Sequence, residues 1–352
     1  MVNVGIIGYG KMGKIRADAL SAKGARICAV YDAYPEGSPD AGTAVHVDTP
    51  DQIIEDPQID AVVICLPNHL NKPTTEQALR AGKHVFCEKP PAFTADEVRS
   101  IMEVEKQSGK VLMYGFNHRH HDAVIKMKEI MDSGTYGRIL WMRGRYGKSV
   151  DSDYLQTWRA DKDKAGGGIL IDQGIHMLDL FLHLGGGFDT VHAFVSSLFW
   201  QIEGVEDNVF AIMKNSQTGL AASLHSTMTQ WRHLFSLEVF LESGYMVLNG
   251  LKTSSGTYGD EELTVARNRT KAPAATWDDE ERFIFHVDNS WEKEAEHFLS
   301  AITENTPVTL GSSQDALAVM SLIDEIYDHD HHVLDELNTT LKPIAGGISG
   351  NN

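Results

Sequence analysis

The chain has 352 residues, of which 49 are acidic and 31 basic, so its formal net charge is −18 at pH 7. This length exceeds the size at which one hydrophobic core keeps growing, so two domains are expected. The acidity argues against nucleic-acid backbones and anionic membrane surfaces as main partners, and no apolar run reaches the length of a transmembrane helix.

The three cysteines, Cys28, Cys65 and Cys87, all fall in predicted buried strands. Three thiols cannot pair completely within one chain, and such residues are typical of apolar packing in a reducing compartment. Met1 leads directly into the first predicted strand, without the basic start and cleavage site of a secretory signal. The sequence therefore predicts a cytoplasmic protein.

An apolar strand at the start of the chain breaks into a glycine-rich turn, with VNVGIIGYGKMG over residues 2–13. Gly8 permits the sharp turn, Gly10 lets the backbone approach a pyrophosphate, and Gly13 lets the following helix pack on the strand. The motif alone is a weak signal, but a second predicted strand ends in Asp32 at the spacing of a ribose-binding carboxylate. The pattern predicts a dinucleotide-binding fold.

The identity of the dinucleotide depends on the residue after the second strand. A carboxylate at Asp32 accepts hydrogen bonds from two ribose hydroxyls and repels a 2′-phosphate, which favours NAD over NADP. Lys11 and Arg16 lie nearby in the sequence and keep NADP as an alternative.

Strands and helices alternate through the first third of the chain, which indicates a parallel, doubly wound sheet. Ligands of such sheets lie beyond the carboxyl ends of the strands, so Asp32 and the segments 66–68 and 88–90 are expected around one crevice. The predicted strands are residues 2–7, 27–31, 61–66, 84–87 and 111–114. The predicted helices run through residue 19, near 75–81 and from residue 94.

Strand candidates dominate after residue 120, which favours an α+β domain with a large, mostly antiparallel open sheet. These strands are predicted at residues 139–146, 191–200, 209–213, 220–227, 235–241 and 245–248. Helices are expected at 172–184, 290–302 and 312–327, and a long surface loop over 253–279. The predicted division is a dinucleotide-binding domain (1–120), a substrate-binding and oligomerisation domain (121–342) and a flexible tail (343–352).

Four polar residues recur in an otherwise apolar helix after the glycines at 166–168. Asp172, His176, Asp179 and His183 follow at steps of four, three and four, so they are predicted to share one helical face. A face of Asp and His without Lys or Glu suits the wall of a cleft, and we expect Asp172 and His176 to meet a ligand. The alternative is that these polar side chains form their hydrogen bonds within the core. This alternative is favoured for Asp179 and His183.

Lys89 follows the strand predicted at residues 84–87 and precedes two prolines. Burial near a nicotinamide ring is expected to lower its pKa and make the amine useful in proton transfer. Oxidation of an alcohol needs a base, and His176, oriented by Asp172, suits that role while Lys89 polarises the same oxygen. A lysine in a surface turn is the alternative.

The chain resembles the Gfo/Idh/MocA oxidoreductases over nearly its whole length. The most specific blocks are GKHVFCEKP (82–90) and GGGILIDQGIH (166–176), supported by PNHLNKP, GFNHRHH and WRADKDKAGGG. The resemblance implies a hydride transfer between NAD(P) and a secondary alcohol of a sugar, a sugar derivative or a cyclitol. The sugar derivatives include phosphorylated and nucleotide-linked sugars. It places Lys89, Asp172 and His176 at the catalytic positions. Asn71 departs from the family, where histidine often follows the Pro-Asn pair.

The remaining expected contacts follow from the motif and the resemblance together. Cofactor contacts are expected from Gly8, Tyr9, Gly10, Lys11, Met12, Gly13, Asp32, Leu66, Pro67, Asn68, Glu88, Lys89, Trp158 and Arg159. Substrate contacts are expected from Lys89, Asn117, Arg119, Tyr146, Asp172 and His176.

Residues 138–164 contain seven basic and four acidic side chains in an otherwise acidic chain. A negatively charged substrate would fit this excess, and a solvated strand face explains it equally well. No metal is expected, because the histidines at 118, 120 and 121 lack a closed ligand set and DHDHH (328–332) suits a helix end.

Two other functions compete with a dehydrogenase. One is a glycoside hydrolase that uses bound NAD for transient oxidation, and the other is a non-catalytic regulator that senses NAD or sugar. The presence of Lys89, Asp172 and His176 speaks against the regulator. By analogy of fold, the exposed face of the strand-rich domain is expected to form a homodimer or homotetramer.

Overall fold

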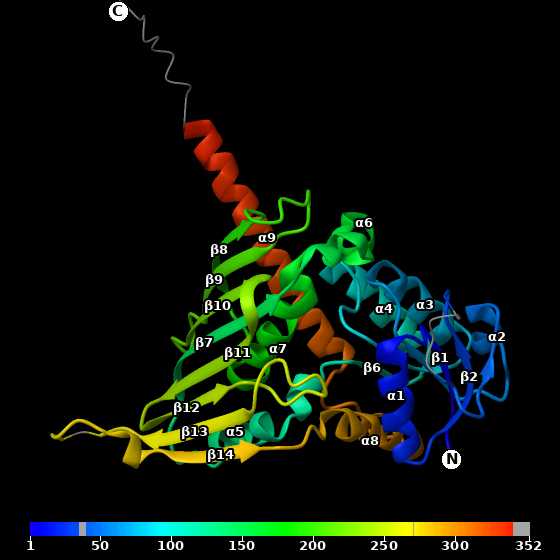
Figure 1. The fold of residues 1–352 in the computed structure, drawn as a ribbon, viewed down its shortest axis with the longest axis horizontal. Helices are drawn as coiled ribbons and strands as arrows, with labels where there is room; N and C mark the ends of the chain where they lie inside the picture. Colours follow the sequence, from blue (N-terminus) through cyan, green and yellow to red (C-terminus); the bar gives the residue numbers. More distant parts are fainter. Residues whose placement is uncertain (35–39, 270, 341–352) are drawn as a thin grey trace, which may run out of the picture.

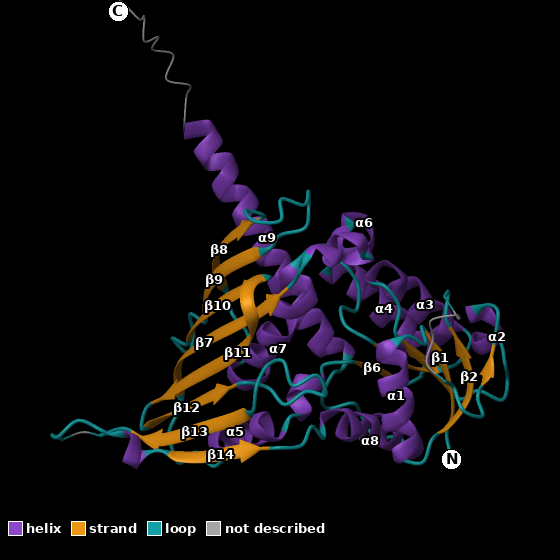
Figure 2. Cartoon of the chain, in the orientation of Figure 1, coloured by secondary structure: helices purple, strands orange, loops and turns teal. Residues whose placement is uncertain are grey.

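The computed structural model describes residues 1–34, 40–269 and 271–340, which build two sheets side by side (Figure 1). The predicted tail, 343–352, lies outside these residues. Within them, no helix combines the length and the apolar character that a membrane span requires. Figure 2 shows helices on both faces of the first sheet and on one face of the second.

The first sheet has six parallel strands in the order β3-β2-β1-β4-β5-β6, which confirms the predicted doubly wound arrangement. The strand order reverses between β1 and β4, the place where such sheets bind ligands. The strands are β1 (Asn3–Ile7), β2 (Arg26–Tyr31), β3 (Val45–His46), β4 (Ala61–Ile64), β5 (His84–Cys87) and β6 (Leu112–Tyr114).

Four helices connect these strands in the described residues, and the start of α4 follows a local signal. Thr94 caps α4, because its side chain accepts a hydrogen bond from the backbone N–H of Glu97. One prediction was wrong: α3 begins at Asn68, well before residue 75, and contains Pro73 because tertiary packing outweighs the local preference against proline. The helices are α1 (Lys11–Ala22), α2 (Pro50–Ile54), α3 (Asn68–Arg80) and α4 (Ala95–Ser108).

The second sheet has eight strands in the order β14-β13-β12-β11-β7-β10-β9-β8, antiparallel except for the β7–β10 pair. The surface loop predicted over 253–279 was wrong, because β13 buries Leu263 and Val265 against the core and joins β14 to the edge. The strands are β7 (Ile139–Ser149), β8 (Thr190–Ser196), β9 (Asn208–Lys214), β10 (Ala221–Thr227), β11 (Thr229–Leu241), β12 (Gly244–Asn249), β13 (Glu261–Arg267) and β14 (Glu281–Phe285).

Helices α5, α7 and α9 lie on one face of this sheet (Figure 1). The last helix continues to Thr340, so the prediction that it ends at residue 327 was wrong. Helix α8 returns to the first sheet, where Phe298 packs edge to face on Phe86 with ring centroids 5.5 Å apart. The helices are α5 (Asp122–Asp132), α6 (Lys162–Ala165), α7 (Ile175–Gly185), α8 (Ser290–Thr303) and α9 (Ser313–Thr340).

Candidate functional site

The turn between β1 and α1 is closed by backbone contacts that leave no room for two side chains. Gly8 has φ +93°, and a Cβ there would lie 2.3 Å from the carbonyl oxygen of Cys65. A Cβ on Gly13 would lie 2.2 Å from the carbonyl oxygen of Gly8. These two glycines are therefore required by the turn and by the packing of α1 on it.

Gly10 is constrained differently, because its side-chain position faces open space. Within the described chain, a Cβ there would meet only Asp32 Oδ2, at 3.8 Å. The first turn of α1 follows directly, and no side chain hydrogen-bonds to it as a cap. Free helix N–H groups beside open space suit a phosphate, and the adjacent carboxylate suits a ribose, so the residues present fit a dinucleotide.

Arg16 is not available to a 2′-phosphate, which removes one reason for considering NADP. Its side chain is buried, with Nε 2.7 Å from Glu88 Oε1 and a second nitrogen bonded to Glu294. Its guanidinium also stacks over Phe86 and Trp291, at 4.3 and 4.6 Å from the ring centroids. Arg16 therefore joins α1 to β5 and α8. Lys11, by contrast, is exposed at the start of α1.

Lys89 lies beyond the carboxyl end of β5, as the sequence predicts. The Asn71 side chain donates to the carbonyl oxygen of Pro90 at 2.8 Å, which holds the turn that carries the lysine. Lys89 Nζ donates to the carbonyl oxygen of Asp172 and lies 3.7 Å from Asp172 Oδ1. Burial lowers the pKa of Lys89, with Arg159 and Lys148 contributing and Asp172 and Glu88 opposing.

Three basic side chains lie around Asp172, which does not orient His176 as the sequence predicts. Asp172 lies in a π-helical turn, Leu170–Gly174, that precedes α7. Its Oδ2 is 3.3 Å from Lys148 Nζ, and its Oδ1 is 3.6 Å from Arg159 Nε. Burial opposes ionisation of this carboxyl, but the three cations outweigh it, so the pKa of Asp172 lies well below its ordinary value. No hydrogen bond joins Asp172 to His176 in the described chain.

His176 stacks on a second imidazole instead. Its ring lies on that of His118, with centroids 3.9 Å apart and an interplanar angle of 13°. His118 is fixed by Asn117 Oδ1 and by the Tyr146 hydroxyl, each 3.1 Å from a ring nitrogen. Burial, reinforced by Lys89, holds the pKa of His176 well below its ordinary value, so the ring is neutral near pH 7. Its Nδ1 is buried without a hydrogen-bond partner in the described chain.

The polar face predicted for this helix divides at the π turn, because the extra residue in that turn shifts the helical period. Asp179 lies in the core and accepts two hydrogen bonds from Arg119, at 2.8 and 2.6 Å, which confirms the core role expected for it. Arg119 also contacts Asp315 at 2.9 Å. The guanidinium of Arg119 is thus engaged by two carboxylates, those of Asp179 and Asp315.

Several of the other expected contact residues are engaged with their neighbours. Asn68 donates to the carbonyl oxygen of Ala165 at 2.8 Å, and the Arg159 guanidinium lies over the Trp158 ring at 4.4 Å. Asn117 also donates to Ser290 Oγ at 3.3 Å. Leu66 and Pro67 lead into α3, and Tyr9 and Met12 flank the glycine turn.

The sequence analysis did not identify two residues of the candidate site, Lys148 and Glu206. Lys148 was counted only among the basic residues of its segment, although the alternation of β7 places it on the side of Tyr146. Glu206 accepts hydrogen bonds from the backbone N–H groups of Gly168 and Leu170, at 2.6 and 2.8 Å, and so holds the start of the π turn. A lone acidic residue between strands gives no sequence signal for such a role.

The described histidines of the two clusters do not converge on a common point. His118 faces Tyr146, His120 packs near the His297 ring at 5.9 Å, and His121 Nδ1 is 2.7 Å from Glu261 Oε2. The second cluster was expected at a helix end, which was wrong because α9 continues past it, with His329 beside β8.

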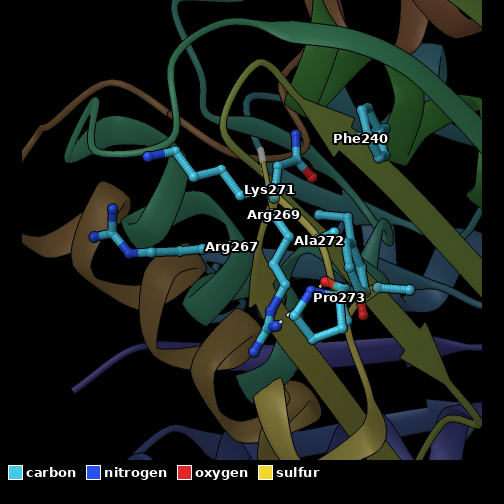
Figure 3. Close-up of a pocket in the computed structure, with 10 residues that line it drawn as sticks. Phe240, Arg267, Arg269, Lys271, Ala272 and Pro273 are labelled. Atoms are coloured by element: carbon cyan, nitrogen blue, oxygen red, sulfur yellow. Dashed lines mark hydrogen bonds between the residues drawn. The ribbon is translucent and has the colours of Figure 1, made fainter.

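A separate groove lies at the end of the second sheet that is remote from the first sheet. Figure 3 shows it between the end of β13 and the chain that follows, with Arg267, Arg269 and Pro273 among its lining residues. Its volume is about 480 Å³. Arg269 is paired with Asp279 at 2.8 Å, and none of the lining residues is among those expected to contact the cofactor or the substrate.

Comparison with known proteins agrees with this geometry. Residues 2–116 match the model of an oxidoreductase family with an NAD-binding Rossmann fold, and residues 124–247 match a GFO/IDH/MocA C-terminal domain. The chain is 28% identical to the inositol 2-dehydrogenase of Rhizobium meliloti over 333 residues, covering 92% of this chain and 95% of the relative.

A levoglucosan dehydrogenase is similar in both sequence and structure. The enzyme from Pseudarthrobacter phenanthrenivorans is 36% identical over 211 residues, which cover 56% of this chain and only 54% of that relative. A levoglucosan dehydrogenase solved with NADH and levoglucosan has a TM-score of 0.82 at 26% identity, over 94% of this chain and 97% of the other. Since the two family matches together span more than half of its residues, the chain belongs to the Gfo/Idh/MocA oxidoreductase family, with an NAD-binding Rossmann domain at its N-terminus.

Proposed function

We propose that the chain is an NAD(P)-dependent dehydrogenase that acts on a secondary alcohol of a sugar, a sugar derivative or a cyclitol. The observation that carries the proposal is the gathering of Lys89, Asp172 and His176 beyond the carboxyl end of β5. They lie beyond the same edge of the first sheet as the glycine turn between β1 and α1, because all of its strands are parallel. The inositol and levoglucosan dehydrogenases support the substrate class.

The chain's own residues divide the work of alcohol oxidation. Bound NAD supplies a hydride acceptor, and reduced NAD a donor. The Lys89 ammonium polarises the substrate oxygen, and the neutral imidazole of His176 takes the hydroxyl proton. Asp172 holds Lys89 in place through both its carbonyl and its carboxylate, and is a positioning residue in this scheme.

The cofactor is proposed to lie along the edge formed by the glycine turn and the ends of β2, β4 and β5. Its pyrophosphate would face Gly10 and the first turn of α1, and Asp32 would bind the adenosine ribose. Asp32 already accepts a hydrogen bond from the backbone N–H of Tyr34 at 2.8 Å through Oδ1. Its Oδ2 is the oxygen that faces Gly10.

A spectrophotometric screen tests this function. Purified protein with NAD and separate sugars, sugar derivatives and cyclitols is expected to generate the absorbance of reduced nicotinamide with one group of related substrates. A chain that binds NAD and cleaves glycosides without net reduction would be a hydrolase of the transient-oxidation type, and the dehydrogenase proposal would be wrong. Binding of NAD without any turnover would favour a sensor.

We also propose that the exposed face of the second sheet joins copies of the chain. Its register brings apolar side chains of neighbouring strands together: Phe194 pairs with Phe210, and Ile212 follows two residues along β9. These three are 68%, 49% and 62% exposed, and Trp141 of β7 stacks on Phe240 of the same face. Sedimentation of wild type and Ile212→Glu should give a dimer or tetramer and a smaller species, respectively.

A cytoplasmic location is part of the same proposal. Cys28, Cys65 and Cys87 are unpaired, and burial raises the pKa of Cys87 to about 12, so this thiol stays protonated. Unpaired buried thiols are typical of reducing compartments. Fractionation of cells that express a tagged chain tests the location.

A further inference from the structure

The glycines that precede the π turn are packed against two residues that the proposed function does not use. A Cβ on Gly168 would lie 1.9 Å from the carbonyl oxygen of Glu206, and a Cβ on Gly167 would lie 2.5 Å from the Tyr327 hydroxyl. Both distances are too short for a real contact, so Glu206 and Tyr327 occupy space that side chains at these positions would need. The run of glycines therefore reflects a close contact at the start of the π turn.

Glu206 accepts hydrogen bonds from three consecutive backbone N–H groups at this point. Its carboxylate oxygens accept from Gly168 and Leu170, at 2.6 and 2.8 Å, and its backbone carbonyl accepts from Ile169 at 3.0 Å. The first N–H groups of a helical segment have no partner within that segment, and an acidic side chain is favourable there. One residue thus supplies the partners that the start of the π turn lacks.

Tyr327 of α9 fixes the side chain of this glutamate. Its hydroxyl donates to Glu206 Oε1 at 3.0 Å, and the same oxygen also accepts from Leu170. Glu206 is only 7% exposed, so water does not readily replace a lost partner. Tyr327 therefore connects the last helix of the chain to the turn that carries Asp172.

A short path of hydrogen bonds leads from Glu206 to the candidate catalytic lysine. The carbonyl oxygen of Gly168 accepts from the N–H of Asp172 at 3.1 Å, and the carbonyl oxygen of Asp172 accepts from Lys89 Nζ. The Asp172 carboxylate lies 3.7 Å from the same nitrogen. Because a displacement of about 1 Å at a reacting group can lower the rate about 10²-fold, the support of this turn matters for turnover.

Resting on the proposed function, we infer that Glu206 and Tyr327 are positioning residues, which hold the π turn so that Asp172 keeps the Lys89 ammonium on the substrate oxygen. Neither residue touches substrate in this scheme. A role in stability alone would affect the amount of folded protein and leave Lys89 unchanged in the folded fraction. The two roles therefore differ in what a variant does to Lys89.

Glu206→Gln and Tyr327→Phe test the inference by activity. The amide has one acceptor oxygen in place of two, so one backbone N–H loses its partner, and Tyr327→Phe removes a single hydroxyl. With the best alcohol from the spectrophotometric screen, kcat should fall about tenfold or more in the first variant and about threefold in the second, while KM for NAD changes little.

The ionisation of Lys89 gives a measurement that requires no turnover. The pH dependence of Lys89 acetylation by acetic anhydride, followed by mass spectrometry on the full chain, has its midpoint at the pKa of the amine. A displaced Asp172 stabilises the ammonium less, so the midpoint should move to lower pH in both variants. The charged and titratable groups that face Lys89 are unchanged in both variants: Asp172, Glu88, Arg159, Lys148 and His176.

Asp207→Asn is the matched control, because Asp207 is the next residue and its Oδ2 also accepts two backbone N–H groups. These belong to Phe199 and Trp200, at 2.7 and 2.9 Å, and lie outside the π turn. The control should lower Tm and keep the wild-type midpoint. A wild-type midpoint in Glu206→Gln with a similar loss of Tm would overturn the inference. Tyr327→Phe, which keeps the ring, provides the same test where Glu206→Gln does not fold.

These measurements separate the inference from the proposed function. If wild type oxidises no alcohol but the midpoint moves in both variants, the dehydrogenase proposal fails and the positioning of Lys89 stands. If wild type oxidises a sugar or cyclitol and both variants keep its midpoint and its kcat, the function stands and the positioning role is wrong.

Discussion

The two halves of the candidate site are built in opposite ways. The cofactor half, formed by the glycine turn and Asp32, comes from one short stretch of chain and is shaped by backbone contacts of 2.2–2.3 Å that a Cβ would make. The chemical half joins Lys89 and Asp172, which are 83 residues apart, through side-chain and carbonyl contacts. The first half depends on the lack of a side chain at Gly8, Gly10 and Gly13. The second half depends on a balance of charges.

This difference predicts different kinds of sensitivity. An added methyl group at Gly8 or Gly13 would overlap a backbone oxygen, so the response should be steric and should not depend on pH. A changed charge near Asp172 alters the ionisation of every neighbour, because burial strengthens their interactions. Substitutions in the two halves should therefore be separable by what they change: cofactor affinity in one, turnover and its pH dependence in the other.

Lys89→Met should have the largest effect. Loss of the ammonium removes the group that polarises the substrate oxygen, so kcat should fall by about 10³-fold, while the dissociation constant for NAD changes little. His176→Ala should behave in the same way. Steady-state rates and NAD titrations by fluorescence check both quantities.

The matched control is Lys83→Met, a second buried lysine at the other end of β5. Lys83 Nζ donates to the carbonyl oxygens of Asp56 and Ile59, the latter at 2.7 Å, far from the substrate crevice. This variant should lower Tm and retain kcat. Near wild-type activity in Lys89→Met would contradict the catalytic assignment.

Gly13→Ala and Gly10→Ala should divide the cofactor half into a structural and a ligand-dependent position. A Cβ at Gly13 meets a backbone oxygen that cannot move aside, and the free energy of unfolding should fall by about 1–3 kcal/mol. A Cβ at Gly10 meets only Asp32 Oδ2 within the described chain, so Tm should be retained while NAD binds about tenfold or more weakly. Thermal unfolding and NAD titration of both variants check this, and equal losses of Tm would contradict it.

The same contrast explains how far the sequence could be interpreted. Gly8, Gly10, Gly13 and Asp32 carry their physical reasons within a single strand-turn-helix unit, so the dinucleotide fold was predictable. The partner of Arg16 was not, because Glu294 is 278 residues away and belongs to α8. Only tertiary packing brings such residues together.

The arrangement of the chemical half differs from the one that the sequence predicts. Lys89, Asp172 and His176 were selected from residue type, position and family resemblance, but a regular helix was assumed where a π turn changes the period. Asp172 consequently pairs with Lys148 and Arg159, and the His176 ring stacks on that of His118. β13 was taken for a loop because its polar ends mask two buried residues, Leu263 and Val265.

Asp32→Ala should have a smaller effect, confined to cofactor choice. Loss of the carboxylate removes hydrogen bonds to the ribose and the repulsion of a 2′-phosphate, so NAD should bind about tenfold more weakly and its advantage over NADP should narrow. Asp18→Ala is the control, since Asp18 is an exposed acid of α1 paired with Lys14 at 2.8 Å. An unchanged ratio of NAD to NADP affinity in Asp32→Ala would reject the ribose role.

The smallest expected effect is a displacement of the pH profile, and its sign tests the charge balance directly. Burial, Arg159 and Lys148 lower the pKa of Lys89, and Asp172 raises it. Because the ammonium form is the active one, kcat/KM for a neutral sugar should fall as pH rises through this lowered pKa. Asp172→Asn removes an attraction to the ammonium and should move the descending limb to lower pH.

Lys148→Met supplies the opposite displacement. It removes a repulsion from the Lys89 ammonium, so the same limb should move to higher pH. Opposite shifts in the two variants cannot arise from a general loss of stability, which would lower activity at every pH. Shifts in the same direction would mean that Asp172 and Lys148 act on the reaction through something other than the ionisation of Lys89.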